Sequence, residues 1–256
     1  MKVYGNCMLQ TTCRIAGKAK YCHEDCYGYG FFHGSTGTGG IWGLADIPKA
    51  YGAIRISHLP FTKDNPIAYK FVKKYAEDSL DYVGKGRGLY MYSVPNPKNP
   101  MGTGTGKTTA AVVVLNEFLV ARVSQHIRKE RRVDEVPGLF VNVARYQNLY
   151  NSQFRGTPDM QQEAARRYYN RRGLLEKVEL LVLDDMGVRN ATEAFMGEIY
   201  DIIDLRASEL LATIFTSNVP LDKLAEMLDE RISSRIEGMS LPVAFEGADK
   251  RKGMLL

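Results

Sequence analysis

The stretch MGTGTGKTTAAVVVLNEFLV, residues 101–120, decides the fold of this chain. It places Gly104, Gly106, Lys107 and Thr108 directly ahead of an apolar run of helical length. Glycines in such a loop let backbone N–H groups turn toward phosphate oxygens, the lysine reaches the β- and γ-phosphates, and the hydroxyl binds Mg²⁺. The positive N-terminal end of the following helix faces the same anion. The pattern predicts a P-loop that binds ATP and Mg²⁺.

This loop departs from the usual pattern G-x-x-x-x-G-K-[ST] at the first glycine. Met101 occupies that position, Gly102 follows it, and a proline-rich segment precedes both. We expect an extended but working loop, because G-x-G-K-T between a strand and a helix is rarely accidental; the alternative is a glycine-rich turn with a solvated lysine. The predicted nucleotide-binding residues are Gly102, Thr103, Gly104, Thr105, Gly106, Lys107, Thr108 and Thr109.

Short apolar runs alternate with longer helical ones on both sides of the loop. The runs of strand length are 89–93, 139–143, 180–183, 212–216 and 242–245. The intervals between the first four are long enough for the helical crossovers that parallel strands require. The pattern predicts an α/β fold, with a parallel sheet flanked by helices.

A further segment, residues 65–83, has apolar side chains at the spacing of one helix face. Pro66 stands where the first turn of a helix tolerates proline. We therefore expect one helix over this segment.

An acidic pair, Asp184 and Asp185, ends the third predicted strand. Two carboxylates at the carboxyl end of a buried parallel strand are costly to desolvate unless a cation or water meets them. We expect Asp184 to hold Mg²⁺ together with Thr108, and Asp185 to orient the attacking water as the base. The alternative is that the pair caps the next turn.

Three more polar residues are candidates for the same chemistry. Asn218 follows the fourth predicted strand, where its amide would hold the attacking water or the γ-phosphate; alone, it would be a turn residue. Arg231 and Arg235 share a helix face, and like charges at that spacing repel each other. An external anion, the γ-phosphate in a neighbouring subunit, would explain them. The alternative is pairing with Glu230 and Glu237.

The motifs GLYMYS, GTGKTT, LLVLDDMG, TIFTSN and RISSRI occur in that order, and the set resembles AAA+ ATPases. The nearest resemblance is to DnaC/DnaI-type replicative helicase loaders and their IstB-like relatives, over residues 46–256. It implies that these segments are the first strand, Walker A, Walker B, sensor 1 and an arginine-finger motif. Arg235 is then favoured over Arg231 as the finger, and Arg251 is the candidate for sensor 2. Because the sequence ends at Leu256, we expect no C-terminal lid domain, as in these loaders.

All four cysteines lie within the first 26 residues. Their spacing lacks the paired C-x2-C knuckles of many zinc sites. Disulfides are rare in the cytosol, however, and a unit this small cannot bury enough core to fold unaided. We therefore expect one Zn²⁺ held by Cys7, Cys13, Cys22 and Cys26. Two alternatives stay open, namely His23 or His33 in place of one cysteine, and free structural thiols.

The cysteine cluster is followed by GSTGTGGIWG, residues 34–43, which is rich in glycine and reads as a linker. We expect a cysteine-rich zinc-binding module with this linker in residues 1–45, and the AAA+ ATPase domain in residues 46–256. DnaI-like loaders carry an N-terminal zinc module that holds the helicase, and the resemblance implies the same role here.

A basic stretch lies between the P-loop helix and the acidic pair. Residues 121–172 contain 11 basic and 5 acidic residues, whereas residues 173–256 contain 9 and 16. Arginines neutralise phosphates and tyrosine rings stack on unpaired bases. In initiator-type AAA+ proteins a helical insertion in this region lines a DNA channel. We expect single-stranded DNA to contact Arg166, Arg167, Tyr168 and Arg171; the alternative is a solvated helix face with its tyrosines packed inward.

Composition places the chain among ordinary globular proteins, with 45% apolar and 25% charged residues. Its longest mostly apolar stretch is interrupted by polar residues and is shorter than a membrane helix requires. The first residues have no apolar core of a secretory signal. We expect a cytoplasmic protein without a membrane segment.

These observations favour an ATP-dependent loader of a hexameric replicative helicase onto single-stranded DNA during replication initiation. Such a loader would self-associate into a homo-oligomer, each subunit completing its neighbour's site with Arg235. Two alternatives remain, namely an IstB-like ATPase that helps a transposase, and a non-hydrolysing zinc adaptor that binds helicase or single-stranded DNA.

Overall fold

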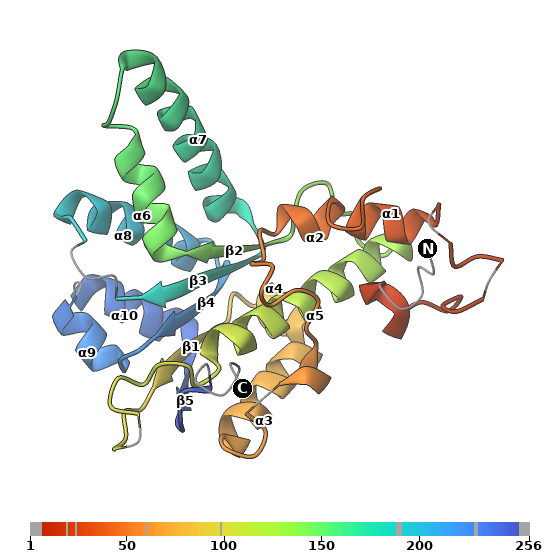
Figure 1. Cartoon of the computed structure of the whole chain (residues 1–256), viewed down its shortest axis with the longest axis horizontal. Coiled ribbons are helices and arrows are strands. Elements are labelled where there is room, and N and C mark those ends of the chain that lie inside the picture. Colours follow the sequence, from red (N-terminus) through yellow and green to blue (C-terminus); the bar gives the residue numbers. More distant parts are fainter. Residues whose placement is uncertain are drawn as a thin grey trace.

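A parallel sheet forms the centre of the protein (Figure 1). The computed structural model describes residues 7–250 except 19, 24, 60, 98, 188–190 and 228–229. The sheet has five strands in the order β2-β3-β4-β1-β5, and every pairing is parallel. The strands are β1 Gly88–Ser93, β2 Gly138–Asn142, β3 Leu180–Met186, β4 Ala212–Ser217 and β5 Ser240–Phe245. All five predicted strands and the parallel α/β architecture are confirmed.

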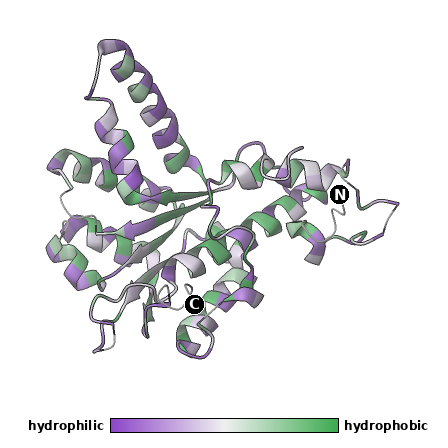
Figure 2. Ribbon diagram, in the orientation of Figure 1, coloured by the Kyte–Doolittle hydropathy of each residue, from purple (hydrophilic) through white to green (hydrophobic). Residues whose placement is uncertain are grey.

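One long helix, α5 (Lys107–Ile127), packs against four of the five strands and begins in the P-loop. It is long and apolar enough to cross a membrane, the one such helix among the described residues, but most of it is buried inside the protein. Figure 2 shows the same apolar character along α5 and the strands. Helix α5 is therefore a buried core helix that packs against the sheet.

Two shorter helices pack beside α5, where the sequence predicts one. They are α3 (Pro66–Glu77) and α4 (Ser79–Gly84). The chain leaves helical geometry at Asp78, which ends α3 and precedes α4. The start of the predicted helix is confirmed, with Pro66 as the first helical residue.

Further helices, α6 to α10, follow strands β2, β3 and β4 in the chain. Helices α8 (Glu193–Ser208) and α10 (Glu230–Met239) contact each other, and α9 (Leu221–Met227) precedes α10. Helices α6 (Val143–Ser152) and α7 (Pro158–Lys177) form a hairpin, here called the α6–α7 arm. The arm projects from the body, and α7 is largely hydrophilic (Figures 1 and 2).

The N-terminal residues pack on the C-terminal half of α5, with which they share a core. They contain η2 (Met8–Thr11), α1 (Tyr27–His33) and α2 (Gly40–Leu44). Phe32 and Ile41 are buried in the main hydrophobic cluster of the protein. The N-terminal residues and the rest of the protein therefore share one hydrophobic core. The predicted domain boundary at residue 45 stays a prediction.

The glycine-rich stretch, residues 34–43, which the sequence predicts as a linker, is folded. It includes most of α2, and Gly40 has a φ of 58°, a left-handed conformation. A Cβ at Gly40 would lie 2.6 Å from the carbonyl oxygen of Phe31. The glycines therefore allow a tight turn between α1 and α2, and do not mark flexibility here.

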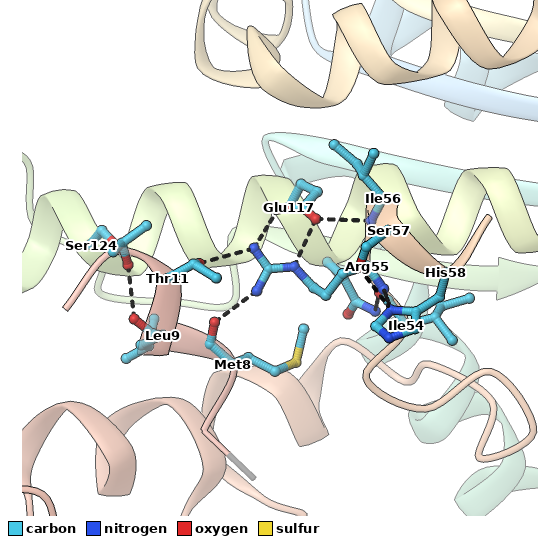
Figure 3. Close-up of polar contacts among 12 residues, drawn as sticks. Met8, Leu9, Thr11, Ile54, Arg55, Ile56, Ser57, His58, Glu117 and Ser124 are labelled. Atoms are coloured by element: carbon cyan, nitrogen blue, oxygen red, sulfur yellow. Dashed lines mark hydrogen bonds and ion pairs between the residues drawn. The ribbon is translucent and has the colours of Figure 1, made fainter. Parts of the chain in front are cut away.

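Arg55 joins the N-terminal segment to α5 (Figure 3). Its guanidinium donates to both carboxylate oxygens of Glu117, at 2.7 and 2.5 Å, and to the carbonyl oxygen of Met8 at 2.7 Å. Both charged side chains are less than one-fifth exposed. Bidentate pairing with little water is the strong form of this interaction. η3 (Ile56–His58) follows directly and donates its first backbone N–H to the same carboxylate.

We expect Arg55→Ala to lower the free energy of unfolding by about 2 kcal/mol, because it leaves a half-buried carboxylate without its partner. Chemical denaturation measures the change. The matched control is Lys73→Ala in the exposed pair with Glu77, which should cost less than about 0.5 kcal/mol. Equal, small effects of the two substitutions would show that the Arg55 contact does not fasten the N-terminal segment.

Candidate nucleotide site

The loop before α5 takes the backbone conformation that phosphate binding requires. Gly102, Gly104 and Gly106 have φ values of 59°, 66° and 104°, which favour glycine. A Cβ at Gly102 would lie 2.6 Å from the Cβ of Ser93. The steric need for glycine thus falls at residue 102, which explains why Met101 is tolerated at the usual first position. Thr105 is buried in the loop, and Thr109 lies partly buried in the first turn of α5.

Lys107 connects the loop to the carboxyl ends of two neighbouring strands. Its buried ammonium donates to Ser93 Oγ at the end of β1 and, at 3.0 Å, to Asn218 Oδ1 just beyond β4. The carbonyl oxygen of Gly102 lies 3.3 Å away. The structure therefore brings together the predicted lysine, the predicted sensor asparagine and the loop.

Asp184 lies beside the first turn of α5. Thr108 Oγ1 donates to Asp184 Oδ1 at 2.8 Å, and the carboxylate is buried. Asn142 at the end of β2 places its Nδ2 at 3.5 Å from Asp184 Oδ2. A hydroxyl and a carboxylate oxygen in contact are the hard donors that Mg²⁺ takes. These two residues therefore fit the predicted magnesium site.

A bulge in β3 separates the two acidic side chains. Asp185 has a φ of 65°, and the register with β4 shifts between Leu183 and Met186. Asp184 is buried at this point and Asp185 is exposed. A left-handed backbone conformation is uncommon at residues other than glycine, and the few examples cluster at functional sites.

The hydroxyl of Thr216 holds this bulge. It accepts from the backbone N–H of Asp185 at 2.9 Å and donates to Asp184 Oδ1 at 2.8 Å. Ser217 Oγ, the next residue of β4, donates to the carbonyl oxygen of Met186 at 3.0 Å. One strand thus orients the acidic end of its neighbour.

Sequence reasoning missed three residues of this site, namely Ser93, Asn142 and Thr216. Each ends, or nearly ends, a predicted parallel strand, and this is where sites in such sheets form. Serine, threonine and asparagine are too common at strand ends to be selected without knowing which strands are neighbours.

The two candidate finger arginines lie on α10, facing α8. Arg235 pairs with Asp204 at 2.6 Å, and Arg231 lies over the ring of Tyr200, 5.0 Å from its centroid. The Arg235 side chain is 50% exposed, so it is accessible to another subunit. Arg251, the candidate for sensor 2, lies outside the described residues.

Two of the four predicted DNA-contacting residues lie on the surface of α7. Arg166 and Arg167 are 71% and 68% exposed and both pair with Glu163. The neighbouring Tyr169 is 61% exposed, a position that the sequence did not select.

The other two are engaged inside the protein. Tyr168 is buried, stacks on Tyr146, and donates its hydroxyl to Glu198 at 2.5 Å, so that its ring cannot stack on a base in this conformation. Its position on the inner face of α7, toward α6 and α8, is the reason. Arg171 donates to Asp46 at 2.7 Å and to a backbone oxygen of β2 at 3.0 Å, and so holds the base of the α6–α7 arm.

The four cysteines are half-buried and form no disulfide. Burial raises the pKa of the Cys7 thiol, and Cys26, Cys22 and Cys13 contribute in the same direction. Among the residues that the structure describes, however, no three potential ligands gather at metal-binding distances. The thiols have the right chemistry for zinc, but this arrangement of them is not a formed zinc site.

His33, the alternative ligand, has a structural role. Its Nε2 accepts the backbone N–H of Met8 at 3.1 Å, and burial lowers its pKa to about 4. The imidazole is therefore neutral near pH 7 and its Nε2 lone pair is already used. His23 lies on the surface, 3.8 Å from the carboxylate of Asp25.

The sheet order, the loop before α5 and the acidic strand end beside it match the AAA+ fold. No protein-family model matches the chain. Over 143 residues, 56% of its length, the chain is 27% identical to proteins named replicative helicase loader DnaC, from Escherichia coli K12 and Shigella flexneri. It spans about half the length of these relatives.

Solved structures agree with this similarity in fold. A crystal structure of DnaI matches 80% of this chain and 95% of its own, with a TM-score of 0.57 and 21% identity. A crystal structure of the DnaC helicase loader matches 77% and 99%, with a TM-score of 0.55 and 21% identity. The resemblance to DnaC/DnaI-type AAA+ proteins is thus confirmed in both sequence and fold.

We expect Thr216→Val to reduce Mg²⁺-dependent ATP hydrolysis about 10- to 100-fold, because residues that orient a metal ligand have effects of that size. Thr216→Ser keeps the hydroxyl and should stay within about threefold of the parent chain. Steady-state hydrolysis over a Mg²⁺ titration measures both. If valine and serine gave equal rates, the hydroxyl would not be needed to place Asp184 and Asp185.

Proposed function

We propose that this chain is an ATP-dependent loader of a hexameric replicative helicase onto single-stranded DNA, working in the cytoplasm at replication initiation. The observation that carries the proposal is the convergence of the Lys107 and Asp184 contacts at one edge of the sheet, on a chain similar to proteins named helicase loaders. ATP would bind at the loop amides and the start of α5.

Each polar residue of this edge has a distinct role in the proposed hydrolysis. Lys107 binds the β- and γ-phosphates, and Asn218 holds the γ-phosphate or the attacking water. Asp185, exposed beside the buried carboxylate, orients that water and accepts its proton. Mg²⁺, held by Thr108 and Asp184, supplies charge neutralisation of the phosphates.

Subunits would assemble side by side, with Arg235 of one reaching the γ-phosphate bound by the next. The exposed position of this arginine on α10 supports the assignment. Arg231 is the second candidate for the same role, and Arg251 would contact the phosphates as sensor 2. In an arrangement of this kind hydrolysis depends on assembly, because a charge stabilising the transition state comes from another subunit.

The α6–α7 arm would contact single-stranded DNA. Arg166 and Arg167 supply exposed positive charge, and Tyr169 supplies an exposed ring beside them. This combination suits unpaired strands, since every base can stack on an aromatic ring. Tyr168 and Arg171 would instead keep the arm in position.

The N-terminal module would bind the helicase, with Zn²⁺ held by the four cysteines after a local rearrangement. Four free, half-buried thiols in one N-terminal module support zinc, and the packing of this module on α5 supports a connection to the nucleotide site.

We expect Lys107→Ala and Asp185→Asn to lower ATP hydrolysis by more than about 100-fold, because each removes a group that acts in phosphoryl transfer. Arg235→Ala should also be inactive alone, yet mixing it with Lys107→Ala should restore part of the rate, since some interfaces then contain both intact groups. Phosphate release measures the parent chain, the three variants and the mixture. Hydrolysis by the parent chain excludes the non-hydrolysing adaptor, and failure of the mixture to recover would remove Arg235 from the neighbour's site.

We expect the purified chain to contain about one Zn²⁺ and to bind a hexameric replicative helicase, with both lost in the double variant Cys22→Ser, Cys26→Ser. The matched readout is ATP hydrolysis, which should stay within about twofold, because η2 and α1, the elements that flank these cysteines in the chain, pack on α5 near Ser124, far from Lys107. Elemental analysis and size-exclusion chromatography with helicase measure the two properties. Helicase binding that survives removal of zinc would contradict the role of the module.

The loading step itself is tested by an unwinding assay with the helicase. The substrate is a DNA duplex with a single-stranded flank, and this flank is coated with a single-strand-binding protein. ATP and the parent chain together should start unwinding, and Lys107→Ala should not. A chain that binds transposase but no helicase would instead indicate the IstB-like function.

A further inference from the structure

The segment after β5, residues 246–250, crosses the P-loop. The backbone N–H of Lys250 donates to the carbonyl oxygen of Gly104 at 3.1 Å. Asn99, in the segment that leads into the loop, donates its Nδ2 to the carbonyl oxygen of Gly247 at 3.0 Å and to that of Thr103 at 2.7 Å. The C-terminal segment and the phosphate-binding loop are therefore bonded to each other directly.

The side chain of Asp249 lies on this loop. Thr103 Oγ1 donates to Asp249 Oδ2 at 3.2 Å. A Cβ built on Gly104 would lie only 1.7 Å from Asp249 Oδ1, so the carboxylate fills the space that this glycine leaves open. A negative charge thus lies against the loop whose amides and lysine are arranged to attract phosphate.

We propose that Asp249 is a gate residue of the nucleotide site, whose carboxylate opposes triphosphate binding and is moved off the loop when ATP binds. The proposal rests on the proposed ATP site and adds to it a residue that sets affinity. Two anions of this kind repel each other, and no hydrogen bond between them can offset the repulsion, since both are acceptors only.

The two ends of the segment are held by different kinds of contact. Asn65, which is buried, bonds both backbone groups of Glu246, at 2.7 and 2.6 Å. At the other end, Lys250 Nζ pairs with Asp64 at 2.5 Å, and the two side chains are 24% and 55% exposed. An ion pair in contact with solvent contributes less to stability than a buried hydrogen-bond network.

Between these ends, Gly247 has a φ of 111°, which other residues rarely adopt. The geometry predicts a local rotation near Gly247 that lifts the Asp249 carboxylate off Gly104 and opens the Lys250 bond to the loop, while Glu246 stays bonded to Asn65. ATP binding would thus move residues 249 and 250 relative to the P-loop.

The first test is equilibrium binding of a fluorescent ATP analogue to the full chain. Asp249→Asn keeps the shape and the acceptor for Thr103 but removes the charge, and it should tighten binding about three- to tenfold. The matched control is Glu246→Gln, which removes an equal charge from an exposed side chain of the same segment and should change binding by less than about twofold. A merely structural role of Asp249 would weaken binding or leave it unchanged, and either result would overturn the proposal.

The second test is hydrogen exchange of the parent chain with and without ATP. Peptides of the P-loop should exchange more slowly with ATP, and the peptide containing Asp249 and Lys250 should exchange faster as the bond to Gly104 opens. Slower exchange in both would mean that the segment closes over the nucleotide, which contradicts a gate.

These outcomes separate the gate from the proposed function. If the parent chain and Asp249→Asn both fail to bind ATP, the nucleotide site itself is wrong. If the parent chain binds ATP, Lys107→Ala does not, and Asp249→Asn equals the parent chain, only the gate is wrong.

Discussion

The site depends on the hydrogen bonds that the buried carboxylate of Asp184 accepts. The carboxylate accepts hydrogen bonds from Thr108 on α5 and from Thr216 on β4, both at 2.8 Å, and so connects the P-loop helix to strands β3 and β4. A buried carboxylate is unfavourable unless hydrogen bonds or a cation compensate for lost water. The protein provides donors from two elements at once, and these donors also determine how the P-loop sits against the sheet.

The bulge at Asp185 is a consequence of the same arrangement. A regular strand would continue the ladder past Leu183, whereas the left-handed residue breaks it and exposes the second carboxylate. Two adjacent acids thereby acquire different surroundings, one buried among hydroxyls and one open to solvent. Different surroundings allow different roles, one as a ligand and one as a base.

Helix α5 is the mechanical connection between the two ends of the protein. Lys107 begins it, and Ser124, near its end, bonds to Thr12 of the N-terminal segment at 2.8 Å. A helix rises about 1.5 Å per residue, so these points lie about 25 Å apart on one rigid element. Arg55 and Glu117 fasten the N-terminal segment between them. Helix α5 therefore joins the nucleotide site to the N-terminal segment directly, and the proposed gate at Asp249 lies at the opposite end of the same helix.

Local patterns in the sequence were sufficient for the strands, the P-loop and the acidic strand end, because each depends on residues close together in the chain. The P-loop, for example, can be recognised from Gly106, Lys107 and Thr108 because these residues are consecutive and lie within one turn of the chain. Tertiary structure decided the rest: the strand order placed Thr216 beside Asp185, packing against α6 and α8 buried Tyr168, and the path of the chain after β5 laid Asp249 on Gly104. Such contacts join residues that no local pattern relates, since their proximity follows from how the whole chain closes around its sheet.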